Sequence, residues 1–278
     1  MLCHVADPLQ ARSARVRAAR ALTQGKQRRA TGQLLAEGPQ AVREAIAGGL
    51  AVEILVGLGW QHRWAAETAA ADVAGVPVHV VQDDALAGLL SAQAPQGIVG
   101  VCRWDPPPWS SVVASPGSRA ALVVAHEMSD PGNAGALVRV ADAAGAVGVG
   151  LSSGSVDPTN AKCVRASAGS LFHLPVVTVG PTPEVVSGLQ ASGYRVLAAD
   201  VTRRSVDLFR AERDGLVGGR VAWLFGNEAH GLPEQVLAAV DEVVRIPILG
   251  RAESLNVATA AAVCLYATAR SNTGEDSR

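Results

Sequence analysis

The stretch 221–266 constrains the fold of this chain more than any other. Residues 221–225 (VAWLF) form a short apolar run that stops at Gly226, and two glycines and several polar residues follow it. A second apolar run, at 243–248, ends just before Gly250, and an Ala-rich segment then runs to about residue 269. Short apolar runs favour buried strands, and glycine-bearing segments favour loops. The stretch therefore predicts two strands that each end in a loop, with a helix after the second loop.

Polar side chains gather in these two loops. Glu228 lies in the first loop, and Ser254 and Asn256 lie in the second. Ser254 is a residue type that caps helices, so we expect the Ala-rich helix to open there. Each loop alone would fit an ordinary strand-to-helix turn. Together they predict a ligand site, because ligands of parallel α/β sheets bind at the carboxyl ends of the strands.

Apolar runs alternate with helical segments along the whole chain. This alternation predicts an α/β fold with a mostly parallel sheet that carries helices on both faces. The sequence DPPPW at 105–109 is the clearest linker signal, because three prolines stiffen the backbone and exclude a helix. We therefore expect a small α/β domain at 1–105, a Pro-rich linker at 106–118 and a second domain at 119–278.

Composition excludes several classes of protein. The chain has 278 residues, 49% of them apolar, so it can bury a sizeable core. No apolar run approaches the roughly 18–20 residues that span a bilayer, and we expect no membrane contact and no signal peptide. The four cysteines, Cys3, Cys102, Cys163 and Cys264, are far apart. We therefore expect neither a disulfide nor a metal site, and a cytoplasmic location.

Charge is distributed unevenly although the net charge is only −1. Residues 1–43 carry eight basic residues and two acidic ones. We expect 10–30 to be a basic helical arm that binds phosphates better than it packs, although an ordinary solvated helix would share this composition. The predicted contacts to a polyanionic partner are Arg12, Arg15, Arg20, Arg28 and Arg29.

Familiar nucleotide and hydrolase motifs are missing from the sequence. There is no Gly-x-x-x-x-Gly-Lys-Ser/Thr loop, no Gly-x-Gly-x-x-Gly after a first strand, and no Ser-His-Asp pattern. A nucleoside-type cofactor can still be held by backbone groups of the two glycine loops. Its adenine would then lie in an apolar slot lined by Ile246 and Leu255, which could equally be core residues.

Four blocks of sequence carry a resemblance to a known family. They are 130–139 (DPGNAGALVR), 157–170 (DPTNAKCVRASAGS), 225–232 (FGNEAHGL) and 246–257 (IPILGRAESLNV). In this order and spacing they resemble the SpoU (TrmH-like) RNA 2′-O-ribose methyltransferases of the SPOUT class. The stretch 96–101 (QGIVGV) resembles the end of that family's N-terminal substrate-binding domain, which is similar to ribosomal protein L30e.

The resemblance implies a trefoil-knotted C-terminal domain, an obligate homodimer and S-adenosylmethionine as cofactor. Backbone groups of Gly226, Ile246 and Leu255 would bind the cofactor, and Asn133 and Arg139 match the residues assigned to catalysis. The remaining residues that it places in the site are Glu228, Ser254 and Asn256. The sequence departs from the family pattern at Asn227 and Ala229, where serine and glycine are usual.

The resemblance also makes RNA the expected polyanion, contacted by the basic arm and by Arg165. By analogy, 23S ribosomal RNA is the expected substrate, and transfer RNA is an alternative. We expect Arg139 to anchor a phosphate next to the target ribose, because guanidinium groups in proteins stay protonated and make poor bases. Two other classes stay open at this point: a non-catalytic protein that binds ribosomal RNA, and a nucleotide-dependent oxidoreductase.

Overall fold

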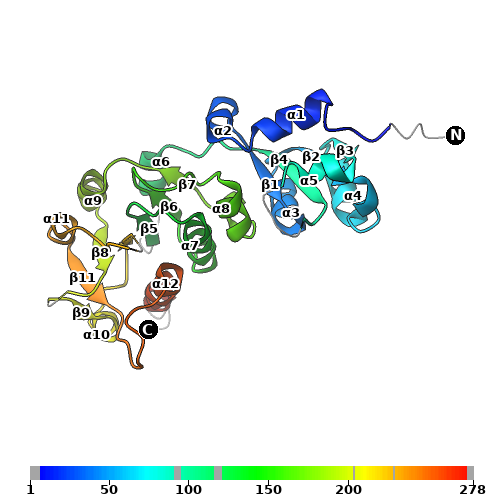
Figure 1. The fold of residues 1–278 in the computed structure, drawn as a ribbon. Coiled ribbons are helices and arrows are strands. Elements are labelled where there is room, and N and C mark those ends of the chain that lie inside the picture. The colour runs from blue at the N-terminus through cyan, green and yellow to red at the C-terminus, as the bar shows by residue number, and fades with distance from the viewer. Residues whose placement is uncertain (1–6, 91–94, 116–120, 203, 228, 274–278) are drawn as a thin grey trace. The chain divides into compact units, whose positions relative to one another are not determined.

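The computed structural model describes residues 7–90, 95–115, 121–202, 204–227 and 229–273. Contacts divide the chain into two compact units, coloured by residue number in Figure 1. The first unit is Met1–Asp105 with Thr159–His173, and the second is Pro106–Pro158 with Leu174–Arg278. The chain therefore enters the second unit, returns to the first for a short segment, and goes back to the second.

The first unit is built on a four-stranded sheet in the order β1-β4-β2-β3. β4 is antiparallel to both its neighbours, whereas β2 and β3 are parallel. The strands are β1 (Gln33–Glu37), β2 (Ala51–Gly57), β3 (Val78–Val81) and β4 (Ile98–Arg103). The helices are α1 (Ala14–Ala21), α2 (Gly25–Thr31), α3 (Pro39–Ala47), η1 (Leu58–Trp60), α4 (Ala65–Val73), α5 (Asp83–Ala87), α8 (Ala161–Ala166) and η2 (Ser170–Phe172).

The basic segment packs more firmly than its composition predicts. It forms two helices, α1 and α2, and Val16, Ala19 and Leu22 are buried in a core cluster that also contains Leu35 and Leu55. The three small apolar residues recur every third position, so they form one stripe along the helix while the arginines between them face solvent. The segment therefore both closes the core of its unit and presents charge.

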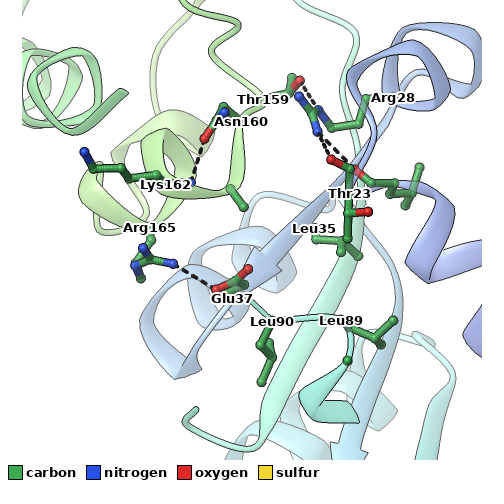
Figure 2. Close-up of a pocket in the computed structure, with 13 residues that line it drawn as sticks. Thr23, Arg28, Leu35, Glu37, Leu89, Leu90, Thr159, Asn160, Lys162 and Arg165 are labelled. Atoms are coloured by element: carbon green, nitrogen blue, oxygen red, sulfur yellow. Dashed lines mark hydrogen bonds and ion pairs between the residues drawn. The ribbon is translucent and has the colours of Figure 1, made fainter. Parts of the chain in front are cut away.

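The segment Thr159–His173 joins the first unit through several polar contacts (Figure 2). Nη1 of Arg165 lies 3.0 Å from Oε2 of Glu37 at the end of β1, and Nε of Arg28 donates to Oγ1 of Thr159 at 2.8 Å. Helix α8 follows at Ala161. Asn160 caps it, because its Oδ1 accepts a hydrogen bond from the backbone N–H of Lys162 at 2.9 Å.

The second unit is built on a seven-stranded sheet in the order β7-β6-β5-β10-β8-β11-β9. Every pair of neighbours is parallel. The predicted α/β fold with a mostly parallel sheet is therefore confirmed. The strands are β5 (Ala121–Ala125), β6 (Gly148–Leu151), β7 (Val176–Thr178), β8 (Arg195–Ala199), β9 (Val206–Asp207), β10 (Val221–Phe225) and β11 (Glu242–Arg245).

Helices cover both faces of this sheet. Its helices are α6 (Trp109–Val113), α7 (Pro131–Ala143), α9 (Thr182–Ala191), α10 (Leu208–Arg213), α11 (Glu234–Leu237) and α12 (Val257–Thr273). Residues of α6, α9 and α11 share one core cluster with Ala222 and Leu224 of β10. The alternate residues of β10 point to the opposite face, where Nε1 of Trp223 donates to Oγ1 of Thr268 on α12 at 2.9 Å. β10 is buried throughout because it lies between two helical layers.

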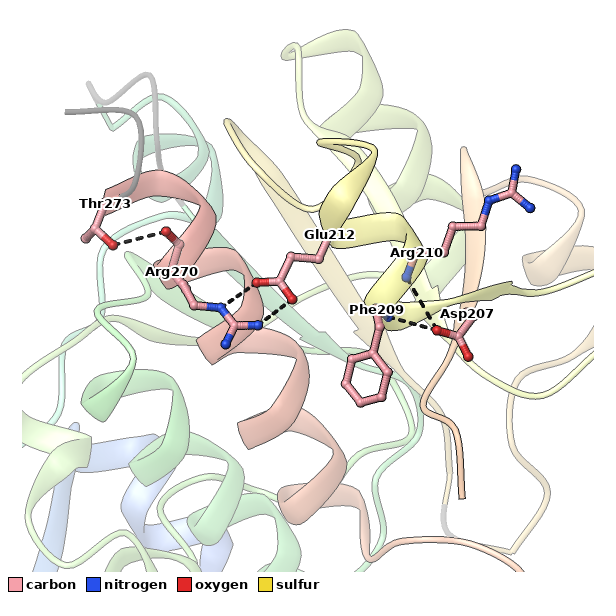
Figure 3. A network of polar contacts seen from close by, with 6 residues as sticks. All are labelled: Asp207, Phe209, Arg210, Glu212, Arg270 and Thr273. Atoms are coloured by element: carbon pink, nitrogen blue, oxygen red, sulfur yellow. Dashed lines mark hydrogen bonds and ion pairs between the residues drawn. The ribbon is translucent and has the colours of Figure 1, made fainter. Parts of the chain in front are cut away.

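The last helix is also tied to α10 (Figure 3). Nε of Arg270 donates to Oε1 of Glu212 at 2.6 Å, and this hydrogen bond raises the pKa of Arg270. Asp207 caps α10 by accepting from the backbone N–H of Phe209 at 3.0 Å. These contacts fix the C-terminal helix along the edge formed by α10.

Several elements in the second unit were not predicted. β9, α10 and α11 have two, six and four residues, which is too short for a periodic pattern to be visible. The segment 106–118, predicted as linker, contains α6, whose Val112 and Val113 are buried in the core. Pro106–Pro108 themselves are not helical, as their ring geometry requires.

The cysteines that the structure describes lie in the interior of the protein. Cys102, Cys163 and Cys264 are buried, and burial raises the pKa of the Cys102 thiol to about 12. Cys3 lies outside the described residues. Within the described ranges, no three His, Cys, Asp or Glu side chains are grouped to hold a metal ion. None of the helices in these ranges has the length and apolar character needed to span a bilayer.

Candidate active site

The loop after β10 is closed by a close approach of two glycines. A Cβ on Gly226 would lie 2.5 Å from the carbonyl carbon of Gly231 and 2.8 Å from its oxygen, so no larger residue fits without movement of the backbone. Beside this contact, the backbone N–H of Asn227 donates to Gly231 at 3.1 Å, and Gly231 donates back to Asn227 at 2.9 Å. The loop is therefore a short, internally bonded turn at the carboxyl end of a buried strand.

Asn227 stabilises this loop with both ends of its side-chain amide. Its Nδ2 donates to the carbonyl of Glu127 at 2.6 Å, and its Oδ1 accepts from the backbone N–H of Ala229 at 2.8 Å. Ala229 is not among the non-glycine residues with positive φ, so the loop needs no glycine there. Both departures from the family pattern are thus accommodated locally. Glu228, which we predicted in the site, lies outside the described residues.

The second loop ends in a helix cap formed by Asn256. Helix α12 begins at Val257, and Oδ1 of Asn256 accepts from the backbone N–H of Ala258 at 2.9 Å. The prediction that Ser254 caps this helix was wrong: Ser254 is exposed and lies two residues before the cap. Asparagine satisfies the unpaired N–H groups at the helix start as well as serine does.

Asn256 also connects α12 to α7. Its Nδ2 donates to Oδ1 of Asn133 at 2.9 Å. Because the cap requires the oxygen of Asn256, the amide orientation is determined by the hydrogen-bond network. Asn133 lies in the first turn of α7, where its backbone N–H donates to Oδ1 of the N-cap Asp130 at 2.8 Å. One hydrogen bond between two amides therefore joins two helix N-termini that are far apart in sequence.

Two adjoining cavities lie between these loops. The larger has a volume of about 460 Å³ and is lined by Asn133, Ala199, Asp200, Val201, Phe225, Gly226, Asn227, Gly231, Ser254, Leu255, Asn256, Val257 and Ala260. The smaller, of about 140 Å³, shares six of these residues and adds Val244, Ile246, Ile248 and Glu253. The larger volume falls within the range of about 300–1,000 Å³ typical of ligand sites. The smaller cavity is mainly apolar, and the larger has a lining of mixed polar and apolar groups.

Asp200 belongs to this site although no sequence pattern singled it out. It follows β8, lines both cavities, and its Oδ2 accepts from the backbone N–H of Leu232 at 3.3 Å. A carboxylate placed beside a nucleoside can accept hydrogen bonds from ribose hydroxyls. Aspartate after a strand is common in turns, so only the fold identifies this one as a cavity residue.

Comparison with known protein families decides between the classes that stayed open. The SpoU rRNA Methylase family matches residues 120–266, and the MRM3-like substrate binding domain matches residues 13–100. The chain belongs to the SpoU rRNA methylase family. The predictions of this family, of methyltransferase activity with S-adenosylmethionine, and of an N-terminal substrate-binding domain are therefore confirmed.

Individual SpoU relatives match most of the chain. One is "23S rRNA (guanosine(2553)-2'-O)-methyltransferase RlmP" of Bacillus subtilis, 32% identical over 87% of this chain and 90% of that protein. A crystal structure of AdoMet-bound rRNA methyltransferase from Sinorhizobium meliloti matches with a TM-score of 0.77 and 31% identity, over 93% of this chain and 94% of that one. AviRb from Streptomyces viridochromogenes, in complex with AdoMet, matches with a TM-score of 0.76 and 26% identity, over 96% of this chain and all of that one (100%).

Arg139 of this SpoU chain lies apart from the two cavities. It is exposed on α7, lines neither cavity, and makes no hydrogen bond or ion pair in the part of the chain that the structure describes. It is six residues from Asn133, a helical rotation of about 600°, so the two side chains leave α7 about 120° apart. The structure thus brings together Asn133, Gly226, Ser254, Leu255 and Asn256, with Ile246 adjoining, and leaves Arg139 outside.

The basic residues that we predicted to contact RNA differ in their availability. Arg12, Arg20 and Arg29 are exposed, and Arg15 is exposed but forms an ion pair with Glu53. Each of these guanidinium groups lies at the surface of the first unit, within reach of a phosphate.

Arg28 and Arg165 both have partners within the protein. Arg28 is only 8% exposed, and its Nη1 donates to the carbonyls of Leu22 at 3.1 Å and Thr23 at 3.0 Å. Its guanidinium stabilises the protein itself, so the predicted phosphate contact does not apply to it in this conformation. Arg165 keeps an exposed side chain (39%) while pairing with the buried Glu37.

Proposed function

We propose that this chain methylates the ribose 2′-hydroxyl of a guanosine in 23S ribosomal RNA. The observation that carries the proposal is that Asn133, Asn256 and Gly226, from three separate segments, line one cavity of mixed polarity beside an apolar one. Relatives such as RlmP carry that substrate in their names. We expect the reaction in the cytoplasm, because ribosomal RNA is assembled in that compartment.

The cavity residues fit S-adenosylmethionine. The apolar wall formed by Val244, Ile246 and Ile248 suits an adenine ring, and Asp200 at its border suits the ribose hydroxyls. Gly226 lines the larger cavity, where its backbone groups would bind the cofactor, and it has to be glycine because a Cβ there would collide with Gly231. When bound, the cofactor supplies a methyl group that is already activated on a positively charged sulfur. The protein therefore needs mainly to align the acceptor and to receive one proton.

The residues around the cavity have different roles in the reaction. Asn256 fixes the side chain of Asn133, so both amides are held in place before RNA binds. Arg139 anchors a phosphate next to the target ribose, for which the planar fork of a guanidinium is suited. Proton loss from the 2′-hydroxyl proceeds through water or through Glu228.

A homodimer with a trefoil-knotted domain completes the proposal. Arg139 is exposed and lies outside the cavities of its own chain. In a site shared between two copies, such a residue can reach the cavity of the other copy. In this arrangement Arg139 of the partner subunit serves the cavity of the first. The exposed Tyr266 of α12, whose hydroxyl donates to the carbonyl of Ala143 on α7 at 3.3 Å, supports the α7–α12 face as the contact surface. The knot is supported by family membership and by the final segment 246–257 lining cavities between earlier loops.

Methyl transfer from radiolabelled S-adenosylmethionine tests this function. We expect the purified chain to label 23S ribosomal RNA from cells that lack the enzyme, and to label it at one guanosine. The labelled dinucleotide should resist alkaline hydrolysis, because a 2′-O-methyl group blocks cleavage of the adjacent phosphate. Label on transfer RNA alone would establish the alternative substrate, and cofactor binding without transfer to RNA would leave only a non-catalytic RNA-binding role.

A further inference from the structure

A third cavity lies in the first unit, in residues to which the methyl-transfer reaction assigns no role (Figure 2). It has a volume of about 480 Å³, again within the range of about 300–1,000 Å³ for ligand sites. One part of its wall is apolar and comes from Leu22, Leu35, Leu89 and Leu90. The other part is polar and comes from Glu37, Arg28 and the segment 159–165.

Charge is arranged unequally around this cavity. Glu37 supplies the carboxylate, and its side chain is only 3% exposed. Three cationic side chains also line the cavity: the buried Arg28, the exposed Lys162, and Arg165, which forms the ion pair with Glu37. Apolar walls with a cationic rim and one buried acceptor match the three parts of a nucleotide, namely a ring, a phosphate and an edge of N–H donors.

We propose that this cavity binds one unpaired guanine nucleotide of the RNA substrate. The base lies among the leucines with its donor edge toward Glu37, and the phosphate lies on Lys162 and Arg165. The inference rests on the proposed function only in taking RNA as the ligand.

Glu37 selects guanine among the four bases. Guanine alone presents two adjacent donors, N1–H and the N2 amino group, which match the two oxygens of a carboxylate. Arg165 binds Oε2 of this carboxylate through Nη1 at 3.0 Å. The same ion pair holds α8 on β1, so it shapes the cavity and orients its acceptor.

Fluorescence anisotropy with labelled RNA heptamers tests the proposal on the full chain. The central residue is guanosine, inosine, adenosine or an abasic ribose, and the other six are uridines. We expect guanosine to bind about tenfold more tightly than the abasic heptamer. Inosine, which lacks the N2 amino donor, should bind at an intermediate level, and Glu37→Gln should abolish the difference between guanosine and adenosine.

Two variants separate the cavity from general charge. Lys162→Ala should weaken every heptamer about three- to tenfold and make the slope of log affinity against log salt shallower by about 0.7, as for one lost phosphate contact. Arg213→Ala removes an exposed cation on α10 of the second unit, outside both the cavity and the basic arm, and should leave both quantities unchanged. Equal affinity for guanosine and abasic heptamers would overturn the proposal, as would equal effects of the two variants.

The assay contains no S-adenosylmethionine, so its outcome is independent of methyl transfer. If the chain prefers the guanosine heptamer but labels no RNA, the nucleotide site stands and the proposed function fails. If it methylates ribosomal RNA but shows no guanosine preference, the reverse holds. The inosine arm changes only the RNA, so it decides the question even if Glu37→Gln, which disturbs a buried ion pair, fails to fold.

Discussion

At the scale of single residues, Asn256 has two separable roles that substitutions can distinguish. Asn256→Asp keeps an oxygen for the α12 cap but removes the donor to Asn133. We expect its melting temperature to stay close to that of the native chain while methyl transfer falls at least tenfold. Asn256→Ala should lose activity and also about 1 kcal/mol of stability with the cap. Full activity in Asn256→Asp would show that the amide pair is not needed.

Arg139 allows a similar test of the phosphate anchor. Because the side chain is exposed and makes no internal contact within the described ranges, its replacement should leave the melting temperature unchanged. We expect Arg139→Lys to lower single-turnover methyl transfer on the order of tenfold, since an ammonium group cannot bind a phosphate bidentately, and Arg139→Ala to lower it further. Near-full activity in Arg139→Lys would contradict both the anchor and any role of the guanidinium as a base.

The family motifs placed Asn133, Gly226, Leu255 and Asn256 in one site, and these four residues line one cavity, while their roles stay predictions. No sequence pattern indicated Asp200, because whether an aspartate after a strand lines a site depends on which other loops reach it.

Arg28 was grouped with the exposed arginines, but it is buried. Composition placed it with the exposed arginines, yet tertiary packing surrounds it with carbonyls and with Thr159, a partner 131 residues away. Burial of an arginine depends on its hydrogen-bond partners, and distant partners are not visible in a local pattern.

At the scale of elements, the two glycine loops differ in how much space they leave. A Cβ at Gly226 would meet backbone atoms of Gly231, whereas a Cβ at Gly250 would meet nothing within 4 Å. We expect Gly226→Ala to destabilise the chain by about 1–3 kcal/mol and to weaken S-adenosylmethionine binding. Gly250→Ala, as the matched control, should stay within about 0.5 kcal/mol of the native chain. Denaturant unfolding measures the stability and calorimetric titration measures cofactor binding, and an equal effect of the two substitutions would contradict the packing of the first loop.

Elements with a clear apolar pattern were predicted more reliably than elements without one. The strand expected at 221–225 agrees with β10, because its continuous apolar run stops at a glycine. The short elements β9, α10 and α11 depend on the sheet that they complete. Their formation is decided by tertiary contacts that local propensity does not contain.

At the scale of the whole molecule, charge on the first unit predicts how RNA binding responds to salt. Deleting residues 1–30 would also remove Val16 and Leu22 from the core, so substitution of the exposed Arg12, Arg20 and Arg29 by alanine is the cleaner test. We expect this triple variant to bind ribosomal RNA fragments with a log–log salt slope that is shallower by about 2 to 3.

The control for that experiment lies on the second unit. Alanine in place of Arg210 and Arg213, which are exposed on α10, should leave the slope nearly unchanged. If both variants changed the slope equally, RNA binding would depend on overall charge rather than on the basic surface of the first unit.

The return of Thr159–His173 to the first unit is the feature of the whole molecule that sequence reasoning missed. These residues fall within the SpoU family match, so a boundary drawn from the proline-rich stretch assigns them to the second domain. Their contacts with Glu37, Glu44 and Arg28 are pairings across more than a hundred residues. Only the folded chain shows that a segment of the methylase half contributes to the substrate-binding unit.

A crystal structure of the chain with S-adenosylmethionine tests the central claim most directly. We predict that the adenine lies against Ile246 and Leu255 in the smaller cavity, and that the sulfonium methyl faces Asn133 and Asn256 in the larger one. An adenosyl group bound elsewhere, or no density between the Gly226 loop and the start of α12, would contradict the account.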